Sequence, residues 1–163
     1  MSRFESSPTH HMQKSFFLKN ESATDQFAEQ LAQQIDDQAL VIYLIGDLGA
    51  GKTHLCRRLL QSLGHKGSVK SPTYTLIEPY RLANRTVLHC DLYRLSDPEE
   101  LEYLGLNDEL DSSSLLLVEW PEKGAGFLPE ADLIITIEIT SESRTAQLHA
   151  QTQQGQAVLA KLT

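Results

Sequence analysis

The octapeptide GDLGAGKT at residues 46–53 constrains the fold of this chain more than any other segment. It matches the pattern G-x-x-x-x-G-K-[ST] at every fixed position. The apolar run at residues 40–45 predicts a buried strand before it, and residues 54–61 have helical spacing after it. A strand, a glycine-rich loop and a helix form the local structure in which this pattern can bind phosphate.

The residue types of this loop suit a phosphate group. Glycine reaches positive φ without strain, so a loop with three glycines can turn several backbone N–H groups inward, and the helix that follows adds its first-turn N–H groups. Lys52 is predicted to reach the β- and γ-phosphates, and the Thr53 hydroxyl to bind Mg²⁺. The alternative is a chance glycine-rich turn. The predicted nucleotide contacts of the loop are Gly49, Ala50, Gly51, Lys52, Thr53 and His54.

Composition limits the class of protein. A chain of 163 residues is the size of one domain, and its net charge of −8 argues against a protein that binds a nucleic-acid backbone by itself. No apolar run approaches the ~20 residues of a membrane span. Cys56 and Cys90 form no CxxC pair, so we expect reduced thiols and a cytoplasmic protein. Residues 1–13 are polar and unpatterned and predict a disordered extension, followed by a single domain over residues 14–163.

Strands and helices alternate in the first two-thirds of the chain. The pattern predicts a three-layer α/β fold of the P-loop NTPase type, with a mainly parallel central sheet and antiparallel C-terminal edge strands. Helices are expected from residue 22 to 35, over 54–63, from residue 96 and over 156–162. Strands are expected over 15–18, 40–45, 75–80, 86–92, 114–119, 133–139 and 145–151.

Two acidic residues end apolar strands and are candidates for the other half of the site. The strand that ends at Glu119 is the more apolar, so we expect it beside the strand of the glycine loop and predict that Glu119 reaches the metal directly or through water. Asp91 is then predicted to act through a neighbouring group or to orient the attacking water. For each, the alternative is a carboxylate that faces solvent at a strand end.

Further candidates flank these acids or lie in a polar loop. Trp120 follows Glu119 and is either a core residue or a lid or partner contact. Tyr93 shares a strand face with Asp91 if the strand continues, and Arg94 is either a phosphate or docking contact or a solvated arginine. Residues 70–74 form either a mobile switch-type loop or a plain connection, and Ser71 and Thr73 supply its hydroxyls.

These motifs together resemble the bacterial TsaE (YjeE) family. The matching segments are GDLGAGKT at 46–53, SPTYTL at 71–76, HCDLYRL at 89–95, PEELEYLG at 98–105 and LLLVEWPEKG at 115–124. The resemblance covers residue 14 to the C-terminus. His54 departs from the family, whose members commonly carry threonine or serine there, so a hydroxyl role at that position is in doubt while the backbone N–H can still bind phosphate.

The resemblance implies a function and a set of site residues. It implies ATP, with Mg²⁺ on Thr53 and Glu119, functional positions at Asp91 and Trp120, an adenine-side contact around Ser22 and a contribution from Arg144. Members of the family act on a complex of TsaD and TsaB in the threonylcarbamoylation of adenosine 37 of tRNAs that read codons beginning with A. We therefore expect an ATPase that is weak alone, a monomer or weak oligomer, with tRNA as an indirect partner.

Other classes of function fit parts of the sequence. A small-molecule or nucleoside kinase fits the size and the glycine loop, but the sequence has no arginine-rich lid segment. A GTPase would carry an N-K-x-D element, which the sequence lacks. A nucleotide-dependent binding module without catalysis stays open, and only turnover measured with the partners separates it from an ATPase.

Overall fold

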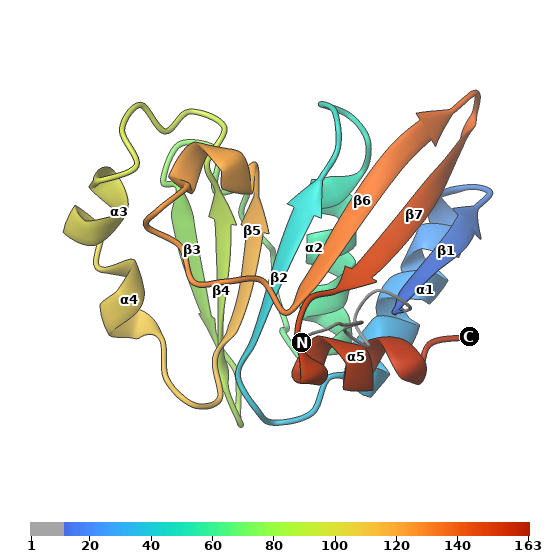
Figure 1. Cartoon of the computed structure of the whole chain (residues 1–163), viewed down its shortest axis with the longest axis horizontal. Helices are drawn as coiled ribbons and strands as arrows, with labels where there is room; N and C mark the ends of the chain where they lie inside the picture. The colour runs from blue at the N-terminus through green and yellow to red at the C-terminus, as the bar shows by residue number, and fades with distance from the viewer. Residues whose placement is uncertain (1–11) are drawn as a thin grey trace, which may run out of the picture.

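The structure is a computed structural model that describes residues 12–163. In this part of the chain, seven strands form one sheet in the order β1-β7-β6-β2-β5-β4-β3 (Figure 1). The strands are β1 (Gln13–Leu18), β2 (Leu40–Ile45), β3 (Ile77–Arg81), β4 (Thr86–Asp91), β5 (Leu115–Glu119), β6 (Leu133–Thr140) and β7 (Ser143–Ala150). The helices are α1 (Glu21–Gln34), α2 (Lys52–Ser62), α3 (Glu100–Tyr103), α4 (Leu106–Glu109), the 3₁₀ turn η2 (Pro121–Gly124) and α5 (Gln153–Ala160).

The sheet is mixed, and the predicted parallel pairing holds for its four central strands, β6, β2, β5 and β4. β2 is parallel to both β5 and β6, and β4 is parallel to β5. The pairs β1–β7, β3–β4 and β6–β7 are antiparallel. The connections β3–β4 and β6–β7 are too short for the crossover that parallel neighbours need, so each must form a hairpin. The predicted C-terminal pair is β6–β7, but it is not at an edge because β1 pairs with β7.

The two faces of the sheet are covered differently. On one face, Leu40, Ile42 and Leu44 of β2 belong to the core cluster that also contains the buried residues of α1, α2 and α5. On the other face, residues of β4 and β5 pack with α3, α4 and the segment around η2. The helix predicted from residue 96 is instead two single-turn helices, because Gly105 adopts a left-handed conformation (φ 74°) and interrupts it. The second helical layer is therefore thin (Figure 1).

The N-terminal elements begin earlier than predicted. β1 begins at Gln13, and the Met12 carbonyl accepts a hydrogen bond from the Ala150 N–H (3.0 Å), so residues 12 and 13 of the predicted extension belong to the folded domain. Residues 1–11 of that extension lie outside the described residues. Helix α1 begins with Asn20 as its N-cap, whose Oδ1 accepts from the Ala23 N–H (2.9 Å), and not with Ser22. In residues 12–163 no helix is long and apolar enough to cross a membrane.

The strand beside β2, which precedes the glycine loop, was predicted correctly. β5 lies directly beside β2, in register from Leu40–Leu115 to Leu44–Glu119. On the other side of β5, the pairing with β4 places Asp91 opposite Glu119. The carboxyl ends of β2, β4 and β5 therefore meet at one edge of the sheet, which is where ligands bind in open α/β sheets.

Candidate functional site

A cavity of about 490 Å³ lies at this edge, at the carboxyl ends of β2, β4 and β5. The glycine loop and the start of α2 form one wall, and the start of α1 and the β6–β7 turn form another. The residues that line it are Leu18, Asn20, Glu21, Thr24, Leu48, Gly49, Ala50, Gly51, Lys52, Thr53, His54, Thr73, Asp91, Glu119, Trp120, Glu142 and Arg144.

The glycine loop has the backbone conformation that its sequence predicts. Gly49 and Gly51 have φ values of 81° and 109°, in the left-handed region where a side chain is strained. No heavy atom lies within 4 Å of where a Cβ would be at either position. Gly51 is the N-cap of α2, an 11-residue helix whose first-turn N–H groups and dipole therefore face the loop. This arrangement is suited to an anion with several oxygens.

Arg144 supports the loop from the neighbouring strand. Its Nε donates to the Ala50 carbonyl (3.1 Å) and one Nη donates to the Gly49 carbonyl (3.4 Å). These bonds hold the carbonyls of Gly49 and Ala50 against β7. They use no backbone N–H group of the loop. Arg144 also lines the cavity, so the sequence prediction of a role near the nucleotide agrees with its position but is not tested by it.

Lys52 is a buried cation, 5% exposed. Its ammonium group donates a hydrogen bond to the Gly46 carbonyl and lies 4.0 Å from the centroid of the Trp120 ring. Burial lowers the pKa of Lys52, and the carboxylates of Glu119 and Asp91 act in the opposite direction. A desolvated ammonium group at the mouth of a glycine loop interacts strongly with a phosphate oxygen, because little surrounding water screens it.

Thr53 and Glu119 provide adjacent oxygen donors. The Thr53 hydroxyl lies 3.0 and 3.1 Å from the two carboxylate oxygens of Glu119, which is 2% exposed. Mg²⁺ prefers oxygen ligands from hydroxyl, carboxylate, phosphate and water. The two side chains therefore fit the ion that the sequence predicted at these positions.

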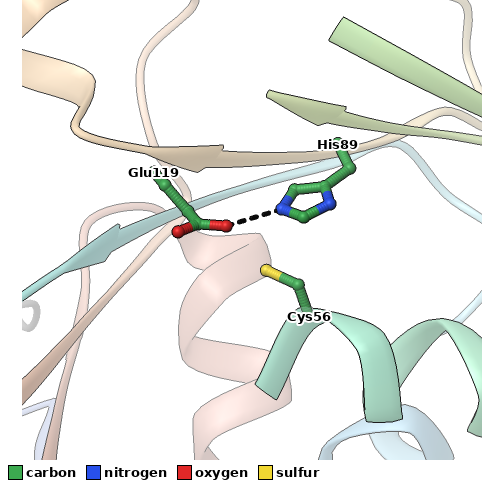
Figure 2. Close-up of side chains that lie close together, drawn as sticks. All are labelled: Cys56, His89 and Glu119. Atoms are coloured by element: carbon green, nitrogen blue, oxygen red, sulfur yellow. Dashed lines mark hydrogen bonds and ion pairs between the residues drawn. The ribbon is translucent and has the colours of Figure 1, made fainter. Parts of the chain in front are cut away.

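A third buried side chain, His89, contacts Glu119 and was not predicted as a site residue. Its Nε2 lies 2.7 Å from Glu119 Oε2, and Cys56 of α2 approaches the same pair (Figure 2). Donor atoms of Cys56, His89 and Glu119 lie within 4.8 Å of one another. Sulfur and nitrogen are poor ligands for Mg²⁺, so only the oxygens of Glu119 and Thr53 suit that ion. The sequence held one signal for His89, its spacing of two from Asp91, which places both on the same face of a strand.

Asp91 lies beside Glu119 and lines the same cavity. It is 7% exposed, and its Oδ1 accepts a hydrogen bond from the Tyr93 N–H (3.1 Å). Burial raises the pKa of Asp91, and the negative charge of Glu119 adds to the increase. A carboxylate with a raised pKa next to a proposed metal ligand can accept a proton from water more readily than an ordinary aspartate.

Replacing Asp91 with asparagine should stabilise the fold at neutral pH. Because the folded pKa is raised, wild-type protein loses stability as pH rises from the ordinary value of 3.8 through the folded value. Asparagine lacks this ionisation and keeps the acceptor for Tyr93. We expect Asp91→Asn to have a higher melting temperature than wild type at pH 7. Thermal melts at pH 7 and pH 3 check this, since the difference should vanish at pH 3.

Trp120 forms part of the cavity wall. It follows β5 with a positive φ of 57°, which is unusual for a bulky residue and turns the chain into η2. Its ring contacts the Lys52 ammonium and lies 5.0 Å from the Tyr93 ring. It also packs against the second core cluster, so it is a half-buried wall residue between the core and the cavity.

The other predicted residues are divided between the cavity and its surroundings. Thr73 lines the cavity, while Ser71 is exposed and shares a hydrogen bond with the Thr73 hydroxyl (2.7 Å). Tyr93 and Arg94 are exposed outside the lining, and the Arg94 guanidinium lies 4.8 Å from the Tyr74 ring centroid. Ser71, Tyr93 and Arg94 therefore lie outside the cavity lining.

The α1 side of the cavity differs from the prediction at one position. Ser22 is exposed and does not line the cavity, whereas Asn20, Glu21 and Thr24 do. Helix α1 begins at Glu21 with Asn20 as its N-cap, so Ser22 is the second residue of the helix and not its cap. His54 lines the cavity, and its Nε2 lies 2.8 Å from Asp25 Oδ1, so its side chain joins α2 to α1.

Fold and site together define an α/β protein with one mixed sheet and a glycine-rich loop beside two strand-end carboxylates. A sequence model described as "Threonylcarbamoyl adenosine biosynthesis protein TsaE" matches residues 18–148. This match covers most of the chain, and the chain therefore belongs to the TsaE family.

Similar proteins support this assignment over most of their length. A tRNA threonylcarbamoyladenosine biosynthesis protein TsaE of Haemophilus influenzae is 50% identical over 133 residues, which is 82% of this chain and 84% of the relative. The protein of the same name from Aquifex aeolicus is 35% identical over 80% of this chain and 91% of its own. The crystal structure of Bacillus subtilis YdiB superimposes with a TM-score of 0.77, at 26% identity, over 92% of this chain and 93% of that one.

Proposed function

We propose that this chain binds and hydrolyses ATP with Mg²⁺, and that it does so in tRNA threonylcarbamoyladenosine biosynthesis. One observation carries the nucleotide part of the proposal. Lys52, Thr53, Asp91 and Glu119 come from three separate segments and face one cavity whose wall is the glycine loop. A phosphate-binding loop, a buried cation and paired acids at parallel strand ends are the parts that P-loop NTPases use, so we assign the fold to that class.

The roles follow from the positions of the side chains. The loop amides and Lys52 bind the triphosphate, Thr53 and Glu119 hold Mg²⁺, and Asp91 orients water. Mg²⁺ supplies charge neutralisation at the phosphate oxygens when it is bound. Asn20, Glu21 and Thr24 lie at the end of the cavity nearest α1 and provide contacts for the nucleoside.

The isolated protein is expected to hydrolyse ATP slowly. Besides His54, the cavity-lining residues of the described chain include two basic side chains, Lys52 and Arg144, and Arg144 is hydrogen-bonded to the loop carbonyls. No arginine of the lining is therefore free to contact a γ-phosphate, a contact that raises rates by about 10³–10⁵-fold in GTPases. A partner that supplies such a group to the site would raise the rate of hydrolysis.

The partners and the location are part of the same proposal. The family name supports a role in threonylcarbamoylation of tRNA. We assign TsaD and TsaB as protein partners and tRNA as an indirect one, since a net charge of −8 suits a protein that leaves most of the tRNA backbone to others. A cytoplasmic monomer or weak oligomer fits this role.

The test measures nucleotide binding and turnover together. The chain has one tryptophan, Trp120, at the cavity wall, so its fluorescence should respond to ATP and Mg²⁺. ATP hydrolysis should be slow alone and rise when TsaD and TsaB are added, and GTP should compete poorly. ADP release that instead requires a small acceptor would identify a kinase. Binding without hydrolysis, with the partners present, would identify a nucleotide-dependent binding module.

A further inference from the structure

The proposed metal ligand Glu119 is held by a second buried side chain that the proposed mechanism does not use. His89 is fully buried, at 0% exposure, in the middle of β4, and its Nε2 lies 2.7 Å from Glu119 Oε2. Figure 2 shows the imidazole ring of His89 and the carboxylate of Glu119 pointing toward one another from adjacent strands. The contact therefore lies inside the sheet–helix layer and away from solvent.

The direction of this hydrogen bond is set by chemistry. When Glu119 is ionised, its carboxylate can only accept, so the proton of the bond is then on His89 Nε2. His89 Nδ1 is buried and has no hydrogen-bond partner among the described residues. The ring is therefore oriented by a single polar contact, the one to Glu119.

Glu119 is in turn shared between two donors. The Thr53 hydroxyl lies 3.0 Å from Oε1 and 3.1 Å from Oε2, and His89 lies on the Oε2 side. Asp91 is the residue paired with Glu119 on β4, and it is also buried. Two neighbouring buried carboxylates repel each other, so a donor is needed to keep Glu119 turned toward Thr53.

We propose that His89 is a positioning residue whose Nε2–H fixes the Glu119 carboxylate beside Thr53 and so sets the affinity of the site for Mg²⁺. The inference rests on the proposed function, since it concerns the metal of that site. Groups that orient a metal ligand through a hydrogen bond typically change metal affinity about 10–100-fold when they are removed. Nucleotide binding without the metal depends on the glycine loop and Lys52, and it should not change.

Two substitutions separate the hydrogen bond from the shape of the side chain. His89→Leu removes the donor and keeps an apolar side chain in a buried position. His89→Gln places an amide N–H the same number of bonds from Cα as Nε2 and so keeps a donor. Cys56→Ala is the matched control, because Cys56 packs beside the pair without a hydrogen bond to it. Thermal melts of all three variants verify that each is folded.

The experiment titrates Mg²⁺ against protein with the non-hydrolysable analogue AMP-PNP, followed by Trp120 fluorescence. A second titration with AMP-PNP in EDTA gives affinity without metal. We expect His89→Leu to raise the Mg²⁺ midpoint at least about tenfold. Its affinity for AMP-PNP in EDTA should change less than about twofold. His89→Gln should return to within about threefold of wild type, and Cys56→Ala should match wild type. In the metal-free wild type, long-range ¹H–¹⁵N NMR should show the His89 proton on Nε2.

Three results would overturn the inference: a wild-type Mg²⁺ midpoint in His89→Leu, a midpoint in His89→Gln as high as in His89→Leu, or the same shift in Cys56→Ala. In each case wild type still binds AMP-PNP and responds to Mg²⁺, so the proposed function survives. A wild-type protein that binds no AMP-PNP would instead remove the proposed function, and the inference with it.

Discussion

Replacing Lys52 with methionine should reduce ATP hydrolysis by at least about 10²–10³-fold, the usual cost of losing one charge or donor aimed at the reacting group. The Lys52 ammonium is buried and lies at the mouth of the glycine loop, where a phosphate oxygen would meet it with little screening by water. Methionine keeps an unbranched side chain against the Trp120 ring and removes the charge together with the hydrogen bond to the Gly46 carbonyl. Steady-state ADP release, with TsaD and TsaB present, measures the loss.

The same variant should not be less stable than wild type. Burial lowers the pKa of Lys52, which means that the folded state disfavours its charged form, so removing the charge relieves that cost. We expect the melting temperature of Lys52→Met to equal or exceed that of wild type at pH 7. Lys66→Met is the control, because Lys66 is exposed and lies away from the cavity. Normal turnover in Lys52→Met would contradict the assignment of the loop as the triphosphate site.

The sequence predicted the parts of the site that depend on local structure. Residues 46–53 fix their own geometry, since the glycines set the turn and the following helix supplies the N–H groups. The position of Glu119 could also be predicted from the sequence, because an apolar strand such as β5 is buried on both faces and so lies centrally in the sheet. β5 is indeed beside β2, and its end faces the loop.

The parts that sequence analysis missed depend on contacts between distant segments. His89 lies in an apolar strand, and nothing local indicates that its partner would be Glu119, 30 residues further along. The pairing of β1 with β7 joins residues more than a hundred positions apart and was not predicted, which is why β7 was expected at an edge of the sheet and is not. Asn20 and not Ser22 is the cap of α1, because the Asn20 Oδ1 accepts the hydrogen bond from the Ala23 N–H.

Replacing Glu119 with glutamine should lower ATP hydrolysis at least about 10²-fold and abolish its normal dependence on Mg²⁺. Glutamine fits the same buried space, and its amide satisfies both neighbours if its oxygen accepts from His89 and its nitrogen donates to the Thr53 hydroxyl. That second bond occupies a lone pair that Thr53 would otherwise offer to the metal, so the substitution weakens both oxygen ligands at once. AMP-PNP binding in EDTA should remain within about twofold of wild type, because the loop amides and Lys52 are unchanged.

Glu122→Gln is the control, since Glu122 is an exposed acid in the adjacent turn η2. Wild-type turnover with a wild-type Mg²⁺ midpoint in Glu119→Gln would show that the metal binds elsewhere, and the paired strand ends would then need another role.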